Sequence, residues 1–121
     1  MKTISKKNTR QKGRKYEKLA EEFLLKRGFE ILERNWQAGH REIDLIARDG
    51  SAIAFIEVKG AKSDSYGHPA EKMTPRKKKN LIQAAEKYII QSNLTGFDIR
   101  FDLITILDEK LEYYRDAFWG E

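Results

Sequence analysis

The chain has 121 residues, of which 40% are hydrophobic and 36% charged, and its formal net charge is +5 at pH 7. This length suits one domain that buries a core of its own. The absence of cysteine excludes disulfides and thiolate metal sites, and no apolar run approaches the roughly 20 residues that cross a bilayer.

The N-terminal segment is basic and polar. Residues 1–9 are predicted to form a flexible tail, followed by a single domain over residues 10–121. No apolar segment follows the basic residues, so no signal peptide is predicted and the expected location is the cytoplasm. Residues 1–15 contain seven Lys and Arg residues and no acid. This charge favours a polyanionic partner, although a solubilising tail has the same composition.

A first helix is predicted from about Thr9 to Arg27. An apolar stripe recurs at helical spacing, and Gly28 supplies the stop. The stripe consists of Tyr16, Leu19, Ala20, Phe23 and Leu24. At 100° per residue Glu17 falls at the edge of this stripe, so it is the helix acid best placed to face a neighbouring sheet. An ordinary boundary glutamate is the alternative interpretation.

Two strands are predicted within residues 42–59, after a first strand from Phe29 to Trp36. The dipeptide Asp49-Gly50 is a strong hairpin signal. If these two residues form the loop, Asp44 pairs with Phe55 and Glu42 with Glu57. Strand alternation then sorts the hairpin residues into two faces. One face receives Glu42, Asp44, Ile46, Ile53, Phe55, Glu57 and Lys59, and the other receives Ile43, Leu45, Ala47, Ala54, Ile56 and Val58.

The second half of the chain continues with a polar loop over residues 60–73. Thr74 and Pro75 have the pattern of an N-cap and first residue of a second helix, which ends before Gly96. Its first turn carries Arg76-Lys77-Lys78-Lys79, a second basic block. A strand over 97–107, a turn over 108–110 and, over 111–119, a last strand or a short terminal segment complete the order α-β-β-β-α-β-β. This order predicts an α/β fold with a mixed central β-sheet flanked by helices.

The acids of the central hairpin point to a metal. Asp44 and Glu57 are expected near enough to share one ion, and carboxylates, a carbonyl and waters are what Mg²⁺ prefers. The carbonyl of Val58 is a candidate ligand, Glu17 could complete the shell, and Lys59 could orient or deprotonate an attacking water. The predicted cofactor is Mg²⁺, with Mn²⁺ as a substitute. A surface charge network on a solvated face is the alternative.

Several short motifs together resemble the YraN family of endonuclease-like proteins. They are Gly13-x3-Glu17, Arg34-Asn35-Trp36, Glu42-Ile43-Asp44-Leu45-Ile46-Ala47, Phe55-Ile56-Glu57-Val58-Lys59 and Arg100-Phe101-Asp102. The family is similar to archaeal-type Holliday junction resolvases of the PD-(D/E)xK restriction-endonuclease-like superfamily. The resemblance covers about residues 13–118.

The resemblance implies a restriction-endonuclease-like core and metal-dependent cleavage of a phosphodiester. Asp44, Glu57 and Lys59 match the core motif, and Glu17 matches the helix acid of the resolvase-like branch. The implied catalytic set is therefore Glu17, Asp44, Glu57 and Lys59, with Glu17, Asp44 and Glu57 as metal ligands. Two positions differ from the usual pattern, since Arg41 replaces a glycine and Ala61 replaces an arginine, which leaves Lys62 as the nearest base.

The leading hypothesis is a Mg²⁺-dependent DNA endonuclease, with branched or flapped DNA as a candidate substrate and a homodimer as a candidate assembly. The competing hypothesis is a non-catalytic module that binds nucleic acid or another partner on a nuclease-like scaffold. Both hypotheses use the basic residues as phosphate contacts. The candidate nucleic-acid-binding residues are Lys12, Arg14, Lys15, Lys62, Arg76, Lys77 and Lys78. Both histidines, His40 and His68, are expected in loops rather than at a metal.

Overall fold

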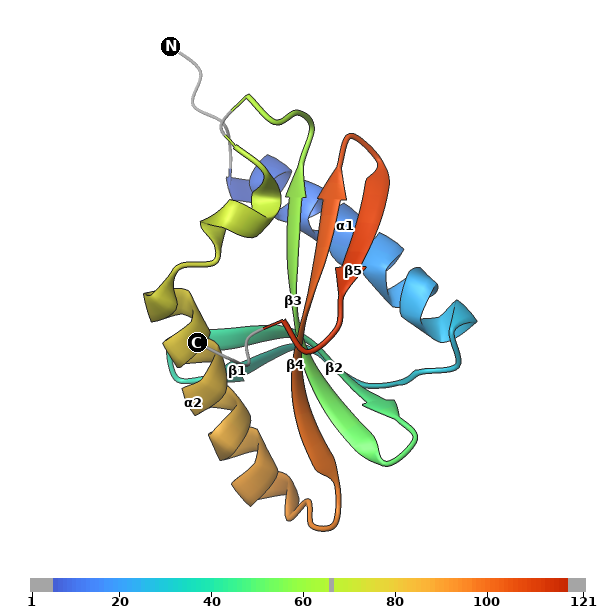
Figure 1. Ribbon diagram of the computed structural model, residues 1–121. Helices are drawn as coiled ribbons and strands as arrows, with labels where there is room; N and C mark the ends of the chain where they lie inside the picture. The colour runs from blue at the N-terminus through green and yellow to red at the C-terminus, as the bar shows by residue number, and fades with distance from the viewer. Residues whose placement is uncertain (1–5, 66, 118–121) are drawn as a thin grey trace.

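The computed structural model describes residues 6–65 and 67–117 (Figure 1). Its elements are α1 (Lys6–Lys26), β1 (Glu30–Ala38), β2 (Arg41–Asp49), β3 (Ala52–Ala61), the 3-10 helix η1 (Pro69–Lys72), α2 (Pro75–Ser92), β4 (Asp98–Leu107) and β5 (Lys110–Tyr114). The predicted order α-β-β-β-α-β-β is confirmed, with η1 as an addition within the segment predicted as a loop.

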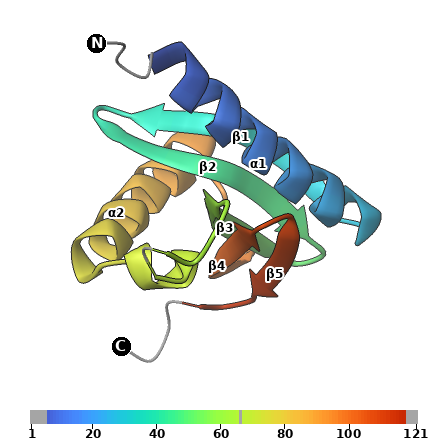
Figure 2. The ribbon, with the colours of Figure 1, turned by 90° about the horizontal axis from the view of Figure 1, so that it is seen from above.

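The five strands form one mixed sheet in the order β1-β2-β3-β4-β5. Only β3 and β4 pair in parallel, and α2 is the helix of the crossover that joins them. The other three neighbouring pairs are antiparallel. Figure 2 shows α1 on one side of the sheet and α2 with η1 on the other. The predicted fold class, a mixed α/β sheet flanked by helices, is therefore confirmed.

The end of α1 and both ends of α2 lie where the local sequence predicts. Gly28 follows α1 with φ 87°, a left-handed conformation that suits glycine. At the start of α2, the Thr74 hydroxyl accepts a hydrogen bond of 3.2 Å from the N–H of Lys77, and Pro75 occupies the first turn. Asn93 ends α2 in the left-handed conformation. Neither α1 nor α2, within the described residues, is long and apolar enough to cross a membrane.

The sheet separates two apolar clusters, one under each helix. The cluster on the α1 side contains Ala20 and Leu24 of the helix together with Leu45, Ala47, Ala54 and Ile56 of the hairpin. The cluster on the α2 side contains Leu81, Ala85 and Tyr88 of the helix together with Ile43, Ile46, Ile53 and Phe55. Phe55 is fully buried and packs its ring against both Tyr88 and Phe101. Burial of these stripes on both faces of one sheet is what holds the three layers together.

The predicted hairpin loop is wrong by one residue. Asp49 pairs with Ala52, so Gly50 and Ser51 form the loop, and Phe55 lies opposite Ile46 rather than Asp44. Gly50 has φ 61° in the first loop position, where the favoured hairpin turns need a positive φ. The predicted Asp49-Gly50 loop would, as a type I′ turn, need a positive φ at Asp49 as well, and Asp49 does not have one. Continuing the same register along the strands brings Asp44 opposite Glu57.

The predicted sorting of the hairpin into two faces also needs correction. Ile43 was expected beside Leu45, yet it belongs to the α2-side cluster together with Ile46. Because Ile43 and Ile46 are three residues apart, regular alternation is interrupted between them. The apolar residues Ile46, Ile53 and Phe55 accordingly fill the core under α2 and do not share a surface with the acids of β2.

Element boundaries differ from the prediction mainly at the ends. α1 begins at Lys6, within the segment predicted as a tail, and residues 1–5 lie outside the described part of the chain. β5 ends at Tyr114, and the predicted strand residues 118 and 119 also lie outside it. His68 is a cap for η1, because its Nδ1 accepts the N–H of Ala70 at 3.1 Å.

Candidate metal centre

The acidic residues lie where the sheet forks. β2 and β3 pair with each other only from Asp49 and Ala52 to Leu45 and Ile56. Beyond that point, the remaining residues of β2 pair with β1 and those of β3 pair with β4. Figure 1 shows β3 and β4 running together toward the top of the view while β1 and the start of β2 lead away to the side. Asp44 is the first residue of β2 beyond the last pair.

Asp44 spans this fork through its side chain. Its Oδ2 accepts a hydrogen bond of 2.8 Å from the backbone N–H of Val58 on β3. The carboxyl also lies within hydrogen-bonding reach of the Glu57 carboxyl, as expected from the corrected register. A backbone N–H that the separating strands leave without a ladder partner is thereby satisfied. The sequence prediction that Asp44 and Glu57 lie together is in agreement with this geometry.

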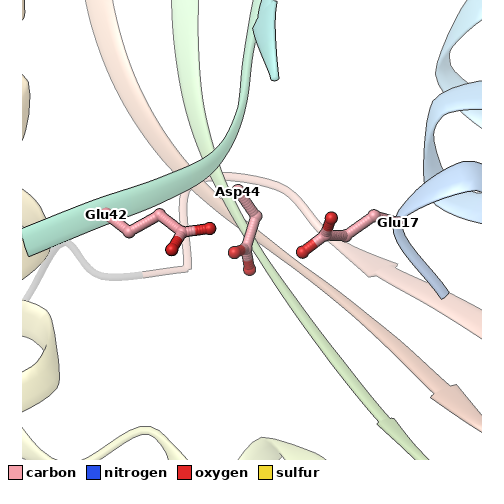
Figure 3. A group of neighbouring side chains, drawn as sticks. All are labelled: Glu17, Glu42 and Asp44. Carbon is pink, nitrogen blue, oxygen red and sulfur yellow. The ribbon is translucent and has the colours of Figure 1, made fainter. Parts of the chain in front are cut away.

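A second acid of β2 and the acid of α1 complete a cluster. One carboxylate oxygen from each of Glu17, Glu42 and Asp44 lies within 4.8 Å of the others. Figure 3 shows the three side chains pointing toward one another, Glu42 and Asp44 from β2 and Glu17 from α1. Three carboxylates at this spacing are a set of hard oxygen donors that suits Mg²⁺ or Mn²⁺. The residues therefore fit a divalent cation.

Ionisation of Glu17 and Asp44 in the cluster is unfavourable because both are partly removed from water and lie beside other acids. Burial, with the negative charges of Asp44 and Glu42, raises the pKa of Glu17 from its ordinary value of 4.5 to about 7, although a hydrogen bond from Asn35 opposes the shift. Burial and the neighbouring Glu57 carboxyl raise the pKa of Asp44 well above its ordinary value. The Val58 N–H and the positive charge of Lys59 lower it in part. Neighbouring negative charges that raise the pKa of Glu17 and Asp44 favour binding of either protons or a cation.

A hollow of about 500 Å³ opens over this cluster, and we call it the acidic hollow. Glu17, Asp44, Glu57 and Lys59 all line it, as do Gly13, Tyr16, Val58, Gly60, Ala61 and Lys62. The structure therefore brings together the four residues of the implied catalytic set. The Val58 backbone, the source of the candidate carbonyl ligand, also borders the hollow.

Close approach of α1 to β3 forms one wall of the acidic hollow. A Cβ atom on Gly60 would overlap the ring of Tyr16, so the ring lies directly on the backbone of β3 at this residue. Only glycine permits this approach. Since Tyr16 precedes Glu17, this contact also fixes how close the Glu17 carboxyl lies to the point where β2 and β3 separate.

The basic candidates fall into separate places. Lys15 and Lys62 line a hollow of about 410 Å³ that continues from the acidic hollow along α1, and the two hollows share Tyr16, Ala61 and Lys62. Arg14 lines a third hollow of about 380 Å³ on the other side of Glu17. Lys12 belongs to α1, and the position of its side chain lies outside what the structure describes.

The basic residues at the start of α2 do not line any of these three hollows along α1. Arg76 and Lys77 are exposed in the first turn of α2, and neither lines the acidic hollow. Lys78 borders a different hollow of about 360 Å³ beside Tyr114 and Arg115. The two basic blocks of the sequence thus belong to two surfaces rather than to one.

Sequence reasoning left three residues out of the site. Glu42 was placed on the acidic face but not among the ligands, although its carboxyl lies in the cluster. Asn35 and Gln37 of β1 contact Glu17 and Glu42, respectively. The spacing Glu42-x-Asp44 is a local signal that could have identified Glu42. Asn35 belongs to the quoted motif Arg34-Asn35-Trp36, but its contact with Glu17 joins β1 to α1 and forms only in the folded chain, whereas Gln37 meets Glu42 across the turn between β1 and β2.

Comparison with known proteins identifies relatives of this chain. The model of one protein family, described as "Uncharacterised protein family UPF0102", matches residues 16–106. A UPF0102 protein of Chloroherpeton thalassium is 44% identical over 106 residues, which is 88% of this chain and 81% of the relative. A UPF0102 protein of Chlorobium limicola is 41% identical over 119 residues, covering 90% of this chain and 92% of the relative. One from Persephonella marina is 36% identical over 107 residues, covering 88% and 92%.

The matched region spans every residue of the acidic cluster, and the resemblance seen in the short motifs is confirmed. The chain belongs to the UPF0102 family, also called the YraN family, of the restriction-endonuclease-like superfamily.

Proposed function

We propose that this protein is a divalent-metal-dependent nuclease that hydrolyses DNA phosphodiester bonds, with branched or flapped DNA as its substrate. The observation that carries the proposal is the convergence of Glu17, Glu42 and Asp44 within 4.8 Å of one another, with Glu17 and Asp44 lining an open hollow. Three carboxylates this close repel one another when ionised, and a bound cation would compensate that repulsion. A bound metal ion would explain why the fold holds these three acids together.

Each side chain of the hollow has a distinct role in the proposed reaction. Glu17, Asp44 and Glu57 hold Mg²⁺, and Glu42 supports the same cluster from β2. The bound cation supplies Lewis-acid polarisation of the phosphate and a lowered pKa of water. Lys59 places an ammonium group at the same hollow, where it orients the attacking water and offsets charge that develops on the phosphate.

The row of three adjoining hollows along α1 is the proposed path of the DNA strand. Hollows adjoin the acidic hollow on both sides, with Lys15 and Lys62 in one and Arg14 in the other. Lys15 and Lys62 on one side and Arg14 on the other would contact phosphates that flank the cleaved bond, although acids also line both hollows. Such contacts position the backbone without reading its sequence.

The decisive experiment measures cleavage of labelled duplex, single-stranded, flapped and four-way-junction DNA with Mg²⁺ or Mn²⁺. We expect cleavage that requires the metal and that is abolished in Asp44→Ala and Glu57→Ala, while DNA binding by both variants is retained. Asp64→Ala, which changes an exposed acid of the loop after β3, is the matched control and is expected to cleave normally. Cleavage that survives both site substitutions contradicts the proposal.

The competing function is DNA binding without cleavage. It is favoured by one observation, the position of Arg76 and Lys77 on a surface apart from the acidic hollow. It predicts salt-sensitive binding that depends on these residues, with a slope set by the number of phosphates contacted. It also predicts no metal-dependent cleavage of any DNA structure. Titration with Mn²⁺ separates the two functions, because only the nuclease requires a cation at Asp44 and Glu57.

A further inference from the structure

A hollow of about 380 Å³ lies beside the acidic hollow and is not needed to hold the metal. We call it the amide hollow. It is lined by Gly13, Arg14, Glu17, Asn35, Gln37 and Glu42, and it shares Gly13 and Glu17 with the acidic hollow. Its volume falls within the range of about 300–1,000 Å³ that is usual for small-molecule sites. The carboxyl of Glu17 therefore borders both hollows.

Two primary amides from β1 line this hollow. The Gln37 Nε2 donates to Glu42 Oε2 at 3.3 Å, and the Asn35 side chain hydrogen-bonds Glu17. Asn35 has φ 49°, in the left-handed region, and a register shift between Ile31 and Glu33 precedes it in β1. An irregular edge strand re-aims side chains away from plain alternation. Here the irregular strand presents two amides to one space.

The charges around the hollow restrict what it can accept. Glu17 and Glu42 contribute two carboxylates, against one guanidinium from Arg14. A phosphate placed between the two carboxylates would be repelled, whereas a neutral group with donors and acceptors would not. A primary amide offers two donors and two acceptor lone pairs, of which the contact with an acid uses one donor. The lining thus suits a neutral, flat, hydrogen-bonding group such as a nucleobase.

We infer that the amide hollow is a base-binding subsite, in which Asn35 and Gln37 hydrogen-bond the edge of the nucleobase adjacent to the phosphate held at the acidic hollow. The position of that phosphate rests on the proposed function. Arg14, at the rim, contacts the backbone of the same nucleotide. A base in this subsite has left the stack, because a paired base has its edge engaged and its faces covered. The substrate class is DNA with an unpaired nucleotide next to the cleaved bond.

The inference is tested by binding rather than by cleavage. The probes are a fluorescein-labelled eight-nucleotide single-stranded DNA and a DNA of the same length in which every nucleotide is abasic. Dissociation constants are measured by fluorescence anisotropy in Ca²⁺ for the wild type, Asn35→Gly and Gln37→Ala. Glycine is chosen at position 35 because it accepts the left-handed backbone without strain.

Each amide substitution is expected to weaken binding of the base-bearing DNA about fivefold, the effect of one hydrogen bond. Neither substitution should change binding of the abasic DNA by more than about twofold. Arg14→Ala should weaken binding of both DNAs equally, because its contact is to the backbone. Gln91→Ala, which removes an exposed amide at the far end of α2, is the matched control and should change neither.

Equal losses on both DNAs, or no loss on either, in Asn35→Gly and Gln37→Ala overturn the subsite. Circular dichroism and thermal denaturation of each variant establish that a loss is not due to unfolding. The outcome is independent of catalysis. A protein that cleaves no DNA can still bind base-bearing DNA less tightly when the amides are removed. An active nuclease can fail to show this effect. Failure of the subsite and failure of the proposed function are therefore distinguishable.

Discussion

The Asp44 carboxylate accepts a 2.8 Å hydrogen bond from the backbone N–H of Val58, across the point where β2 and β3 separate. One side chain thus has two functions. It satisfies a backbone donor that the fork leaves without a ladder partner, and its carboxyl lies close to those of Glu17, Glu42 and Glu57. The structural function needs an oxygen acceptor, whereas the proposed metal site needs a negative charge.

Asp44→Asn separates these two functions. The amide oxygen still accepts the Val58 N–H, while the charge that opposes Glu17 and Glu57 is removed. Without divalent metal we expect the variant to be more stable by about 1 kcal/mol, or about 4 °C in Tm for a domain of this size. The stabilisation of the wild type by saturating Mn²⁺ should disappear. Differential scanning calorimetry with and without Mn²⁺ measures both effects, with Asp64→Asn as control. A variant that Mn²⁺ stabilises as much as the wild type contradicts the assignment.

Metal-free stability should depend on pH through Glu17. The pKa of Glu17 is about 7 in the folded protein and 4.5 ordinarily, so between these values the folded state retains a proton that the unfolded state has released. Stability therefore falls as pH rises through this window, and the full loss is present above about pH 7. Glu17→Gln, which does not titrate, should become progressively more stable relative to the wild type over the same range.

Urea denaturation at several pH values in EDTA measures the difference between the two proteins. Saturating Mg²⁺ should reduce the pH dependence of the wild type, because the cation replaces the proton as the partner of the carboxylates. Two stability curves that run parallel from pH 4.5 to pH 7 would show that Glu17 is not the group responsible.

Gly60→Ala should displace α1 from the sheet. The added methyl group overlaps the Tyr16 ring, and overpacking of this kind destabilises by about 1–3 kcal/mol. In a Tyr16→Ala background the same substitution should lose most of its effect, since the ring is absent. Gly13→Ala is the control, because a Cβ atom there meets nothing within 4 Å and alanine favours a helix by about 1 kcal/mol. Equal losses from Gly60→Ala in both backgrounds, measured by urea denaturation, would exclude the ring as the cause.

Asp102→Asn should be the most destabilising of these changes. Asp102 is fully buried and accepts hydrogen bonds from the Arg100 guanidinium, the Tyr113 hydroxyl and the N–H of Asp116. Loss of its charge leaves the buried guanidinium poorly compensated, which destabilises by about 3–5 kcal/mol. Asp49→Asn should lower the stability of the protein less, because Asp49 makes one contact to Arg100 and its side chain is 33% exposed. A smaller loss for Asp102→Asn than for Asp49→Asn in thermal denaturation would contradict this ranking.

The elements of this fold were predictable from the sequence because their signals are local. The stripe of α1, the Thr74 cap of α2 and the alternation in β4 each depend on residues within a few positions of one another. The same holds for the spacing from Asp44 to Glu57 and Lys59, which lies within one hairpin. The restriction-endonuclease-like assignment depends on these local motifs in their order along the chain.

The hairpin register depended on one backbone angle. Asp49-Gly50 and Gly50-Ser51 are both reasonable loops by residue type, but a type I′ loop at Asp49-Gly50 would need a positive φ at Asp49, and only Gly50 has one. With this shift Asp44, just beyond the last pair, lies level with Glu57 rather than opposite Phe55, and the proposed chemistry requires these two acids together.

The sequence alone therefore determined which residue types could form a metal site and on which elements they lie, because periodicity and capping act over a few residues. Only the tertiary structure decided that β2 and β3 fork at Asp44, that Glu42 joins Glu17 there, and that the basic start of α2 lies on a different surface. These relationships join segments far apart in the chain. They are set by which strands pair and by how closely Tyr16 approaches Gly60, and neither is encoded in any short stretch of sequence.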